Sequence, residues 1–307
     1  MLYTTQLRVR QVALSLDGSR LFFPGGIENR ELQRYDARSK HFVPHFGGPP
    51  ARWVSFSKDG RRAAYSIDLN LWQSRSDGGE RRRLTFPPLA AAAAEWSPDG
   101  KSIAFRGTSP GDGGRVYLMP AEGGTPEALT APQYAAGRPY WSPDGNSLVF
   151  GQAAGPILGG PDCVIKTLDL KSRRAVEWPG SRGMGAEGFS PDGRYFAAMT
   201  IDNTKLMLQD LRFGRWTELA RGNSLFGVYW SRDSNWIYFQ DLKDGVDQPI
   251  SRIHLASGRV ERVAGLSQFE RADALAYSLT GITPDGSPLV SLILGRGEVY
   301  ALDLGFR

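Results

Sequence analysis

The sequence predicts an all-β protein in which seven four-stranded sheets form a ring, the β-propeller architecture. Two observations carry this prediction: a short turn motif recurs seven times, and strand-forming runs stand on both sides of each copy. Successive copies are separated by 42, 40, 45, 48, 41 and 52 residues. These separations fit the roughly 40 to 50 residues of one propeller blade. The aspartates of the copies are Asp17, Asp59, Asp99, Asp144, Asp192, Asp233 and Asp285.

Each copy is a four-residue segment that we call the anchor turn. Its full form is Ser97-Pro98-Asp99-Gly100, which recurs from Ser142 and Ser190, and looser copies begin at Ser15, Ser57, Ser231 and Thr283. Proline presets φ at the first central position of a type I turn, and glycine accepts the left-handed conformation that follows. The serine hydroxyl can hold the turn by a hydrogen bond. The anchor turn therefore predicts a hairpin between the first two strands of each blade.

The remaining strands follow in order within each unit. Runs such as 116–119 and 206–208 are predicted third strands, and short runs such as 129–130 are predicted fourth strands. The last unit ends after its third strand, so Leu2-Tyr3-Thr4-Thr5 is predicted to supply the missing strand and to close the ring. The chain is thus interpreted as one domain, 1–307, whose seventh blade comprises about 285–304 plus 1–5. The alanine run from Leu89 to Glu95 is the one helical candidate.

Composition excludes several classes of protein. Hydrophobic residues make up 41% and charged residues 22%, and the net charge is +5, which together are typical of an ordinary globular domain. The single cysteine, Cys163, excludes an internal disulfide framework and a cysteine-based zinc cluster. No apolar run approaches the ~18 residues of a membrane span, and no secretion signal is recognisable. We expect a cytoplasmic protein, or a periplasmic one if the chain is the C-terminal part of a membrane-anchored regulator.

The repeats resemble a known group of proteins. Trp-Ser-Pro-Asp-Gly followed by a strand such as Ile103-Ala104-Phe105, and the ending from Gly123 to Thr130, resemble the TolB-like, WD-repeat-like propellers of bacteria over essentially the whole chain. Segments 83–88 and 279–285 resemble more narrowly the propeller halves of acidobacterial winged-helix regulatory proteins. The resemblance implies a propeller fold with a sensing or scaffolding role.

Motifs for catalysis and metal binding are scarce in the sequence. Gly183 to Gly188 matches a dinucleotide fingerprint, but it leads into an anchor turn instead of the helix that such a site needs. Three histidines, His41, His45 and His254, are too few for a histidine cluster, although a two-histidine site at His41 and His45 stays open. The acidic loop 241–247 departs from the EF-hand order. We therefore predict no catalytic constellation, no cofactor and no metal site.

Loops from each fourth strand to the next first strand are expected to surround the channel mouth and to carry binding. We predict a non-enzymatic module for a protein or peptide partner, with a small anionic ligand as a further option, and an alternative small propeller enzyme (lyase or hydrolase). We expect neither direct nucleic-acid binding nor membrane insertion, and we expect the protein to be a monomer. The predicted contact residues are Arg10, Arg52, Trp53, Glu95, Arg138, Arg182, Glu187, Arg221 and Phe226.

Overall fold

The computed structural model describes residues 13–25, 29–132, 135–153, 160, 162–269, 271, 273–295 and 298–304. Regular structure in these residues is almost entirely β-strand, and their one helix is the 3₁₀ turn η1 (Leu266–Gln268). No helix in this part of the chain is long and apolar enough to cross a bilayer. The predicted all-β class is confirmed.

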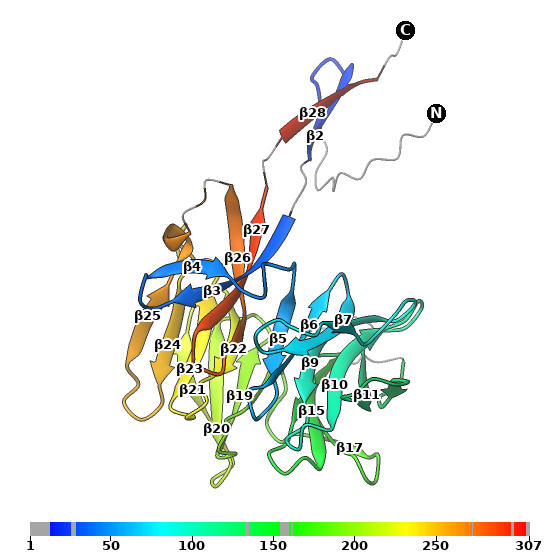
Figure 1. Ribbon diagram of the computed structural model, residues 1–307, viewed down its shortest axis with the longest axis vertical. Coiled ribbons are helices and arrows are strands. Elements are labelled where there is room, and N and C mark those ends of the chain that lie inside the picture. The colour runs from blue at the N-terminus through cyan, green and yellow to red at the C-terminus, as the bar shows by residue number, and fades with distance from the viewer. Residues whose placement is uncertain are drawn as a thin grey trace.

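Five antiparallel sheets are built from consecutive strands, each with four strand positions (Figure 1). The first two contain β5 (Arg52–Phe56), β6 (Arg62–Ile67), β7 (Asn70–Arg75) and β8 (Arg82–Arg83), then β9 (Ala90–Trp96), β10 (Ser102–Thr108), β11 (Arg115–Pro120) and β12 (Glu127–Ala128). In the third, the first position is divided into β13 (Ala135–Ala136) and β14 (Tyr140–Trp141), followed by β15 (Ser147–Ala153), β16 (Val164–Asp169) and β17 (Ala175–Glu177). The fourth and fifth contain β18 (Met184–Phe189), β19 (Tyr195–Thr200), β20 (Lys205–Asp210) and β21 (Arg215–Arg221), then β22 (Leu225–Trp230), β23 (Trp236–Asp241), β24 (Ile250–His254) and β25 (Val260–Ala264).

The sixth four-stranded sheet joins distant parts of the chain. Its inner half is β26 (Ala274–Ile282) and β27 (Pro288–Leu294), and its outer half is β3 (Asn29–Asp36) and β4 (His41–Pro44). β27 pairs antiparallel with β3, so that Leu292 lies opposite Glu31 and Leu289 opposite Arg34. An early and a late segment of the chain therefore share one sheet, although these are not the strands that were predicted to pair.

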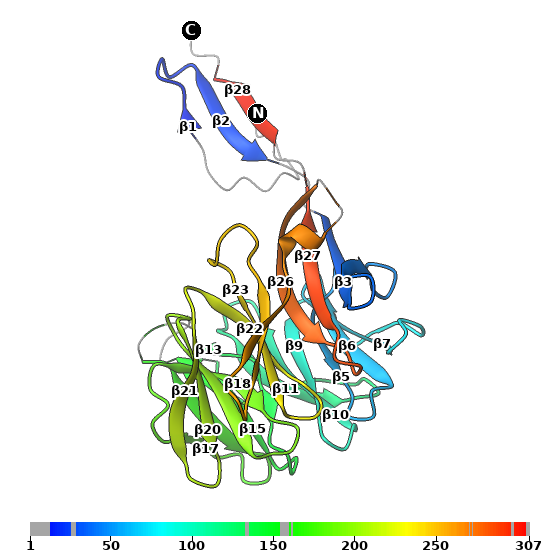
Figure 2. The ribbon, with the colours of Figure 1, turned by 90° about the vertical axis from the view of Figure 1, so that its left-hand side faces the viewer.

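A separate three-stranded sheet holds the first anchor turn. It comprises β1 (Ala13–Leu14), β2 (Arg20–Gly25) and β28 (Glu298–Asp303), with Leu21 of the central strand opposite both Leu14 and Leu302. Figure 2 shows this sheet standing apart from the others. The described residues thus contain six sheets with four strand positions each, one of these positions being divided into two short strands, and one three-stranded sheet, where seven equal blades were predicted. Residues assigned to a seventh blade are divided between β27 and β28, and residues 1–5 lie outside the described residues.

The six four-stranded sheets stand in a circle. Their innermost strands contact one another in the order β5, β9, β14, β18, β22 and β26, and β26 contacts β5 again. One apolar cluster fills each junction between neighbouring sheets. Between the third and fourth sheets, for example, the ring of Phe196 is fully buried and lies 4.7 Å from those of Trp178 and Phe189. Nearest-neighbour interfaces of this kind stabilise repeat proteins.

Burial also explains why the alanine run forms a strand instead of the candidate helix. Ala91 and Ala94 are fully buried in β9, which pairs with β10 and contacts the neighbouring sheet. Alanine has a high intrinsic helix propensity, but tertiary packing routinely overrides so weak a preference. Small side chains at this junction let the two sheets approach closely.

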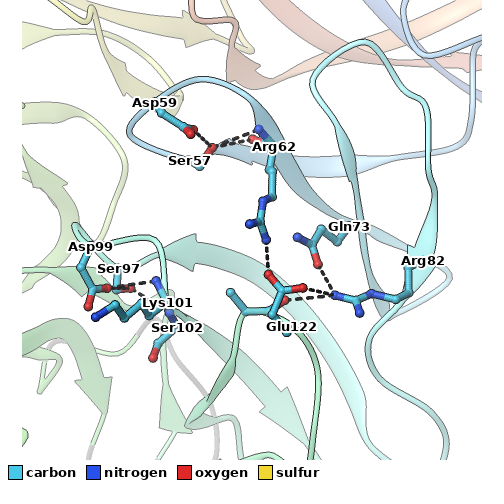
Figure 3. A network of polar contacts seen from close by, with 11 residues as sticks. Ser57, Asp59, Arg62, Gln73, Arg82, Ser97, Asp99, Lys101, Ser102 and Glu122 are labelled. Carbon is cyan, nitrogen blue, oxygen red and sulfur yellow. Dashed lines mark hydrogen bonds and ion pairs between the residues drawn. The ribbon is translucent and has the colours of Figure 1, made fainter.

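The anchor turns share one hydrogen-bond pattern, shown for Ser57 and Ser97 in Figure 3. In every copy the serine or threonine hydroxyl donates to the aspartate, at 2.5 to 2.6 Å in the six serine copies. The Asp99 carboxylate also accepts the Lys101 amide, and the Ser97 hydroxyl accepts the Ser102 amide. The pattern closes a hairpin from local residues alone, which confirms the mechanical interpretation of the motif.

Candidate functional site

A cavity of about 660 Å³ lies between the innermost strands of the ring. All six four-stranded sheets contribute to its lining, from the last residues of each innermost strand to the anchor turn that follows. The cavity therefore reaches the face that carries the anchor turns. The sequence prediction had placed the mouth on the opposite face, among the loops that follow the fourth strands.

Bulges in the innermost strands aim side chains into this cavity. In β9, β18 and β22 the register with the second strand shifts, and Ala93, Gly188 and Gly227 have φ angles of 56°, 102° and 64°. A bulge leaves one residue unpaired and redirects its neighbours. The polar side chains that line the cavity two to four residues before an anchor turn are Ser55, Glu95, Arg138, Tyr140, Glu187 and Tyr229.

Arg138 lies at the centre of a largely buried polar cluster. Its guanidinium forms an ion pair with Glu95, and the two side chains are only 16% and 21% exposed. A second guanidinium N–H donates to the Tyr229 hydroxyl at 3.5 Å, and the Ser55 hydroxyl donates to Glu95 at 3.2 Å. The guanidinium carbon also lies 5.2 Å from the ring centroid of Tyr140 and 5.4 Å from that of Tyr229. Both rings therefore present their π-faces to a cation.

Glu187 is the second carboxyl group of the cavity, and it lies outside the ion pair. Its Oε2 accepts a hydrogen bond from the Tyr140 hydroxyl at 3.5 Å. Within the described part of the chain, no basic side-chain nitrogen lies within 4.0 Å of Glu187. The one guanidinium of the cluster is paired with Glu95 instead.

The protonation states follow from this arrangement. Burial raises the pKa of Glu187 to about 7, against the opposing effects of Arg138 and of the Tyr140 hydroxyl. Burial also raises the pKa of Tyr140 and of Tyr229. Burial disfavours the charge of Arg138, but the attraction of Glu95 and of both tyrosines raises its pKa well above the ordinary value. At neutral pH Arg138 is cationic and the tyrosines are neutral, whereas Glu187 is divided between its two protonation states.

The nine predicted site residues are only partly brought together. Glu95, Arg138 and Glu187 line the cavity, and Arg10 lies outside the described residues. Arg52 and Trp53 lie outside the lining, with the Arg52 guanidinium 4.2 Å from the Trp53 ring centroid. The backbone amide of Trp53 donates a hydrogen bond of 2.6 Å to the Thr280 hydroxyl, which fixes this segment against β26.

The last three predicted residues belong to other parts of the surface. Arg182 pairs with Asp162 at 3.4 Å, and Arg221 pairs with Glu218 at 2.9 Å, with both arginine side chains more than 60% exposed. Phe226 is half-buried in β22 and is not part of the lining. These three residues therefore lie away from the cavity, and both arginines pair with nearby surface carboxylates.

Sequence reasoning missed Tyr140 and Tyr229, although a signal for them existed. Both stand two residues before an anchor serine, the position that Glu95 occupies in its own repeat. Aligning the repeats on their anchor turns would have placed all three side chains at the same depth. Trp141 and Trp230, each directly before an anchor serine, connect neighbouring sheets, because their indole N–H groups donate to the carbonyls of Glu95 and Gly188 in the preceding sheet.

No three His, Cys, Asp or Glu side chains gather as a metal site within the described residues. In the acidic loop 241–247, the Asp241 carboxylate accepts the amides of Asn223, Ser224 and Lys243. That carboxylate therefore closes a loop by hydrogen bonds.

No protein-family model and no curated protein matches the chain, but solved structures do. A structure assigned as TolB from Agrobacterium tumefaciens matches with a TM-score of 0.66 and 16% identity, covering 88% of this chain and 99% of that one. TolB from Acinetobacter baumannii matches with a TM-score of 0.57 and 18% identity, covering 94% and 80%. The fold is that of a TolB-like β-propeller.

Two further matches show how widely this fold is used. An oligogalacturonate lyase in complex with manganese has a TM-score of 0.55 and 14% identity, covering 91% of this chain and 83% of that one. A nidogen/laminin complex has a TM-score of 0.58 and 12% identity, covering 78% and 95%. One is an enzyme and the other a protein complex, so likeness at these identities shows the fold alone.

Proposed function

We propose that the chain is a non-enzymatic binding module whose cavity receives part of a protein or peptide partner. The observation that carries the proposal is the cavity of about 660 Å³, to which all six four-stranded sheets contribute. Ligand sites commonly have volumes of roughly 300–1,000 Å³, with mostly apolar walls and a few placed polar groups. Here tryptophan, phenylalanine and proline side chains form the walls, and the cluster around Arg138 supplies the polar groups.

The cavity is also held rigidly, which favours binding. The indole groups of Trp141 and Trp230 are fixed by hydrogen bonds across sheet junctions. The Arg232 guanidinium donates to the Lys58 carbonyl at 3.0 Å and so connects two anchor turns at the rim. Preorganised walls lower the entropic cost of binding.

One comparison supports a protein as the partner, because a structural neighbour is a nidogen/laminin complex. The sequence resemblance to propeller halves of regulatory proteins points in the same direction. We propose a sensory or scaffolding role in a bacterial regulatory or envelope system.

The direct test is capture of a partner from the organism that encodes the protein. Lys58 is exposed and lines the cavity rim, so Lys58→Trp is expected to obstruct entry and to reduce partner recovery at least tenfold. Lys171 is equally exposed but lies outside the lining, and Lys171→Trp is the matched control. Recovery that is equal for both variants, or no partner at all, contradicts the proposal.

The regulatory part of the proposal has its own test in the genome. A reading frame continuous with Met1 that encodes a winged helix and a membrane segment would support the sensory role. A stop codon immediately upstream would count against it.

One observation favours an acid–base enzyme as the second candidate. Glu187 has a pKa of about 7 and lies in a cavity beside Tyr140 and Arg138. A carboxyl group with a pKa near the working pH suits general acid–base catalysis. Turnover of a member of a carbohydrate and ester panel, abolished by Glu187→Gln, would establish this alternative over simple binding.

A further inference from the structure

We propose that the cavity recognises a cationic group, an ammonium or guanidinium on an alkyl stem, and that the Glu187 carboxylate is its counter-ion. The inference rests on the proposed function and deepens it by naming the chemistry of the ligand. In a peptide partner, this group is the side chain of lysine or arginine.

The first step is a count of charges within the cluster. Glu95 and Glu187 are its two carboxyl groups, and Arg138 is its one cation. Arg138 is committed to Glu95 by the ion pair and to Tyr229 by a hydrogen bond. With Glu187 ionised the cluster carries one uncompensated negative charge, and this charge is costly because Glu187 is half-buried and has no basic partner among the described residues. A cation from outside removes this cost.

The second step is the state of Glu187 when the cavity holds no partner. Four titratable groups act on it or on its neighbours in the cluster: Glu95, Arg138, Tyr140 and Tyr229. Burial raises the pKa of Glu187 to about 7 despite the attraction of Arg138. A bound cation would favour the ionised form, so binding is coupled to release of a proton from Glu187.

The third step is the shape and chemistry of the approach. Glu187 precedes its anchor serine by three residues, with the bulge at Gly188 between them, so at most about 10 Å of strand separates it from the turn at ~3.3 Å per residue. Between this depth and the rim the lining includes Phe189, Trp141, Trp230 and Pro191. An apolar stem with a charged tip matches such a channel, as the side chains of lysine and arginine do.

The rim of the cavity does not distinguish cationic from anionic ligands, so this preference must come from the groups inside the cavity. Lys58 and Arg232 line it together with Asp192 and Asp233, so both positive and negative groups are present there. Deeper in the cavity, the faces of Tyr140 and Tyr229 already accept a cation, that of Arg138. Aromatic faces attract cations and not anions.

The test uses small probes in place of the unidentified partner: n-butylamine and methylguanidinium as cations, n-pentanol as a neutral analogue and butyrate as an anion. Binding is followed by calorimetry and by tryptophan fluorescence, since Trp141 and Trp230 line the cavity. We expect saturable binding of both cations, and binding at least tenfold weaker for n-pentanol and butyrate. Preference for butyrate, or equal binding of n-pentanol and n-butylamine, overturns the inference.

Two further measurements identify the counter-ion. Glu187→Gln should weaken n-butylamine binding at least tenfold, while Glu80→Gln, at a side chain that is 77% exposed and outside the lining, should leave it unchanged. The second measurement uses the wild-type protein, so it does not depend on whether a variant folds. Its affinity for n-butylamine should rise roughly tenfold from pH 6 to pH 8, because Glu187 with a pKa of about 7 ionises over that range. A flat pH profile overturns the inference.

The outcomes separate this inference from the proposed function. If the cations do not bind but Lys58→Trp still prevents partner capture, the cavity binds a partner by other chemistry and only the cation site is wrong. If the cations bind but no partner is captured, the cation site stands and the protein-binding function fails.

Discussion

The anchor turn occurs in two settings, the four-stranded sheets and the separate three-stranded sheet, and the difference shows what makes a blade. Ser15 and Asp17 form the same hydroxyl–carboxylate hydrogen bond, 2.5 Å long, as the serine–aspartate pairs inside the ring. Local chemistry is therefore equal in the two settings. The turn alone does not place its hairpin in the ring.

Contacts with neighbours are what differ. Inside the ring, Gly193 lies against Pro143 and Gly60 lies against Pro284, so that the turn of one sheet packs on the turn of the next. The corresponding Gly18 has no such neighbour within 4 Å, which is also true of Gly100 and Gly286 in the ring, but Leu16, at the proline position, is fully exposed. A blade thus needs both a hairpin and an apolar face that a neighbouring sheet covers.

The largest difference between the two regions is expected for buried apolar side chains. Phe196 is fully buried between two aromatic rings, so Phe196→Ala should lower the free energy of unfolding of the ring by roughly 3–5 kcal/mol. Leu302 is 46% exposed in the three-stranded sheet, and Leu302→Ala should leave the main denaturant transition in place. Equal shifts of that transition would mean that the two regions unfold as one unit.

The next largest difference in stability is expected when alanine replaces two glycines of similar conformation, one in the ring and one in the three-stranded sheet. Gly227 and Gly18 have φ angles of 64° and 70°, but a Cβ on Gly227 would lie 2.9 Å from the Leu279 carbonyl oxygen, whereas Gly18 is open. Left-handed conformation alone costs roughly 1–2 kcal/mol for alanine. Gly227→Ala should therefore destabilise the ring by more than about 2 kcal/mol, because steric overlap adds to that cost.

The matched variant Gly18→Ala isolates the conformational cost. It should reduce hydrogen-exchange protection of β1 and β2 without moving the main transition. A Gly18→Ala effect on the ring as large as that of Gly227→Ala would show that neighbour contacts do not distinguish the two turns.

A smaller, stabilising effect is expected from making the two turns alike. Leu16 occupies the position where the full anchor turn has proline, and its side chain packs on nothing. Leu16→Pro should stabilise the three-stranded sheet by about 0.4–1 kcal/mol, because proline restricts the unfolded chain. Amide exchange in β2 would report the change. Faster exchange there would show that the backbone at residue 16 does not suit proline.

The smallest effect concerns acid titration. Hydrogen bonds from Ser15 and Ser19 lower the pKa of Asp17 from 3.8 to about 2. A lowered folded-state pKa stabilises the fold above the unfolded pKa, and this contribution is lost as the pH falls toward 2. Ser15→Ala should move the Asp17 pKa back toward 3.8, measured by carboxyl NMR titration, while Asp59 in the ring keeps its lowered pKa. An unchanged titration of Asp17 in the variant would show that the Ser15 hydroxyl is not the cause.

Sequence reasoning succeeded where the cause was local. The anchor turns, the hairpins and the four-stranded sheets follow from turn residues and alternating strands, all within about fifty residues. The number of blades did not follow, because strands 29–36 and 41–44 carry the same local pattern whether they pair with β2 or with β27. Which partner they take depends on packing across the sixth sheet, where Leu32 is fully buried.

The site was predictable to a similar extent. Glu95, Arg138 and Glu187 were named as residues of the segments that lead from a fourth strand to the next first strand, but the ion pair of Arg138 with Glu95 instead of Glu187 depends on the bulges of β9 and β18. Arg182 and Arg221 stand 8 and 10 residues before their anchor serines, against 4 for Arg138, and they pair with nearby carboxylates. Spacing locates a residue along a strand, whereas backbone irregularities decide where its side chain points.

The mixed origin of the sixth sheet has a consequence for biosynthesis. β3 and β4 leave the ribosome among the first strands, but β27, against which β3 pairs, is among the last. During translation the early pair has no edge to join, and closing so long a loop carries an entropic cost. The ring of a nascent chain is therefore completed only after β27 has been synthesised, and a product truncated before β27 lacks the strand with which β3 pairs.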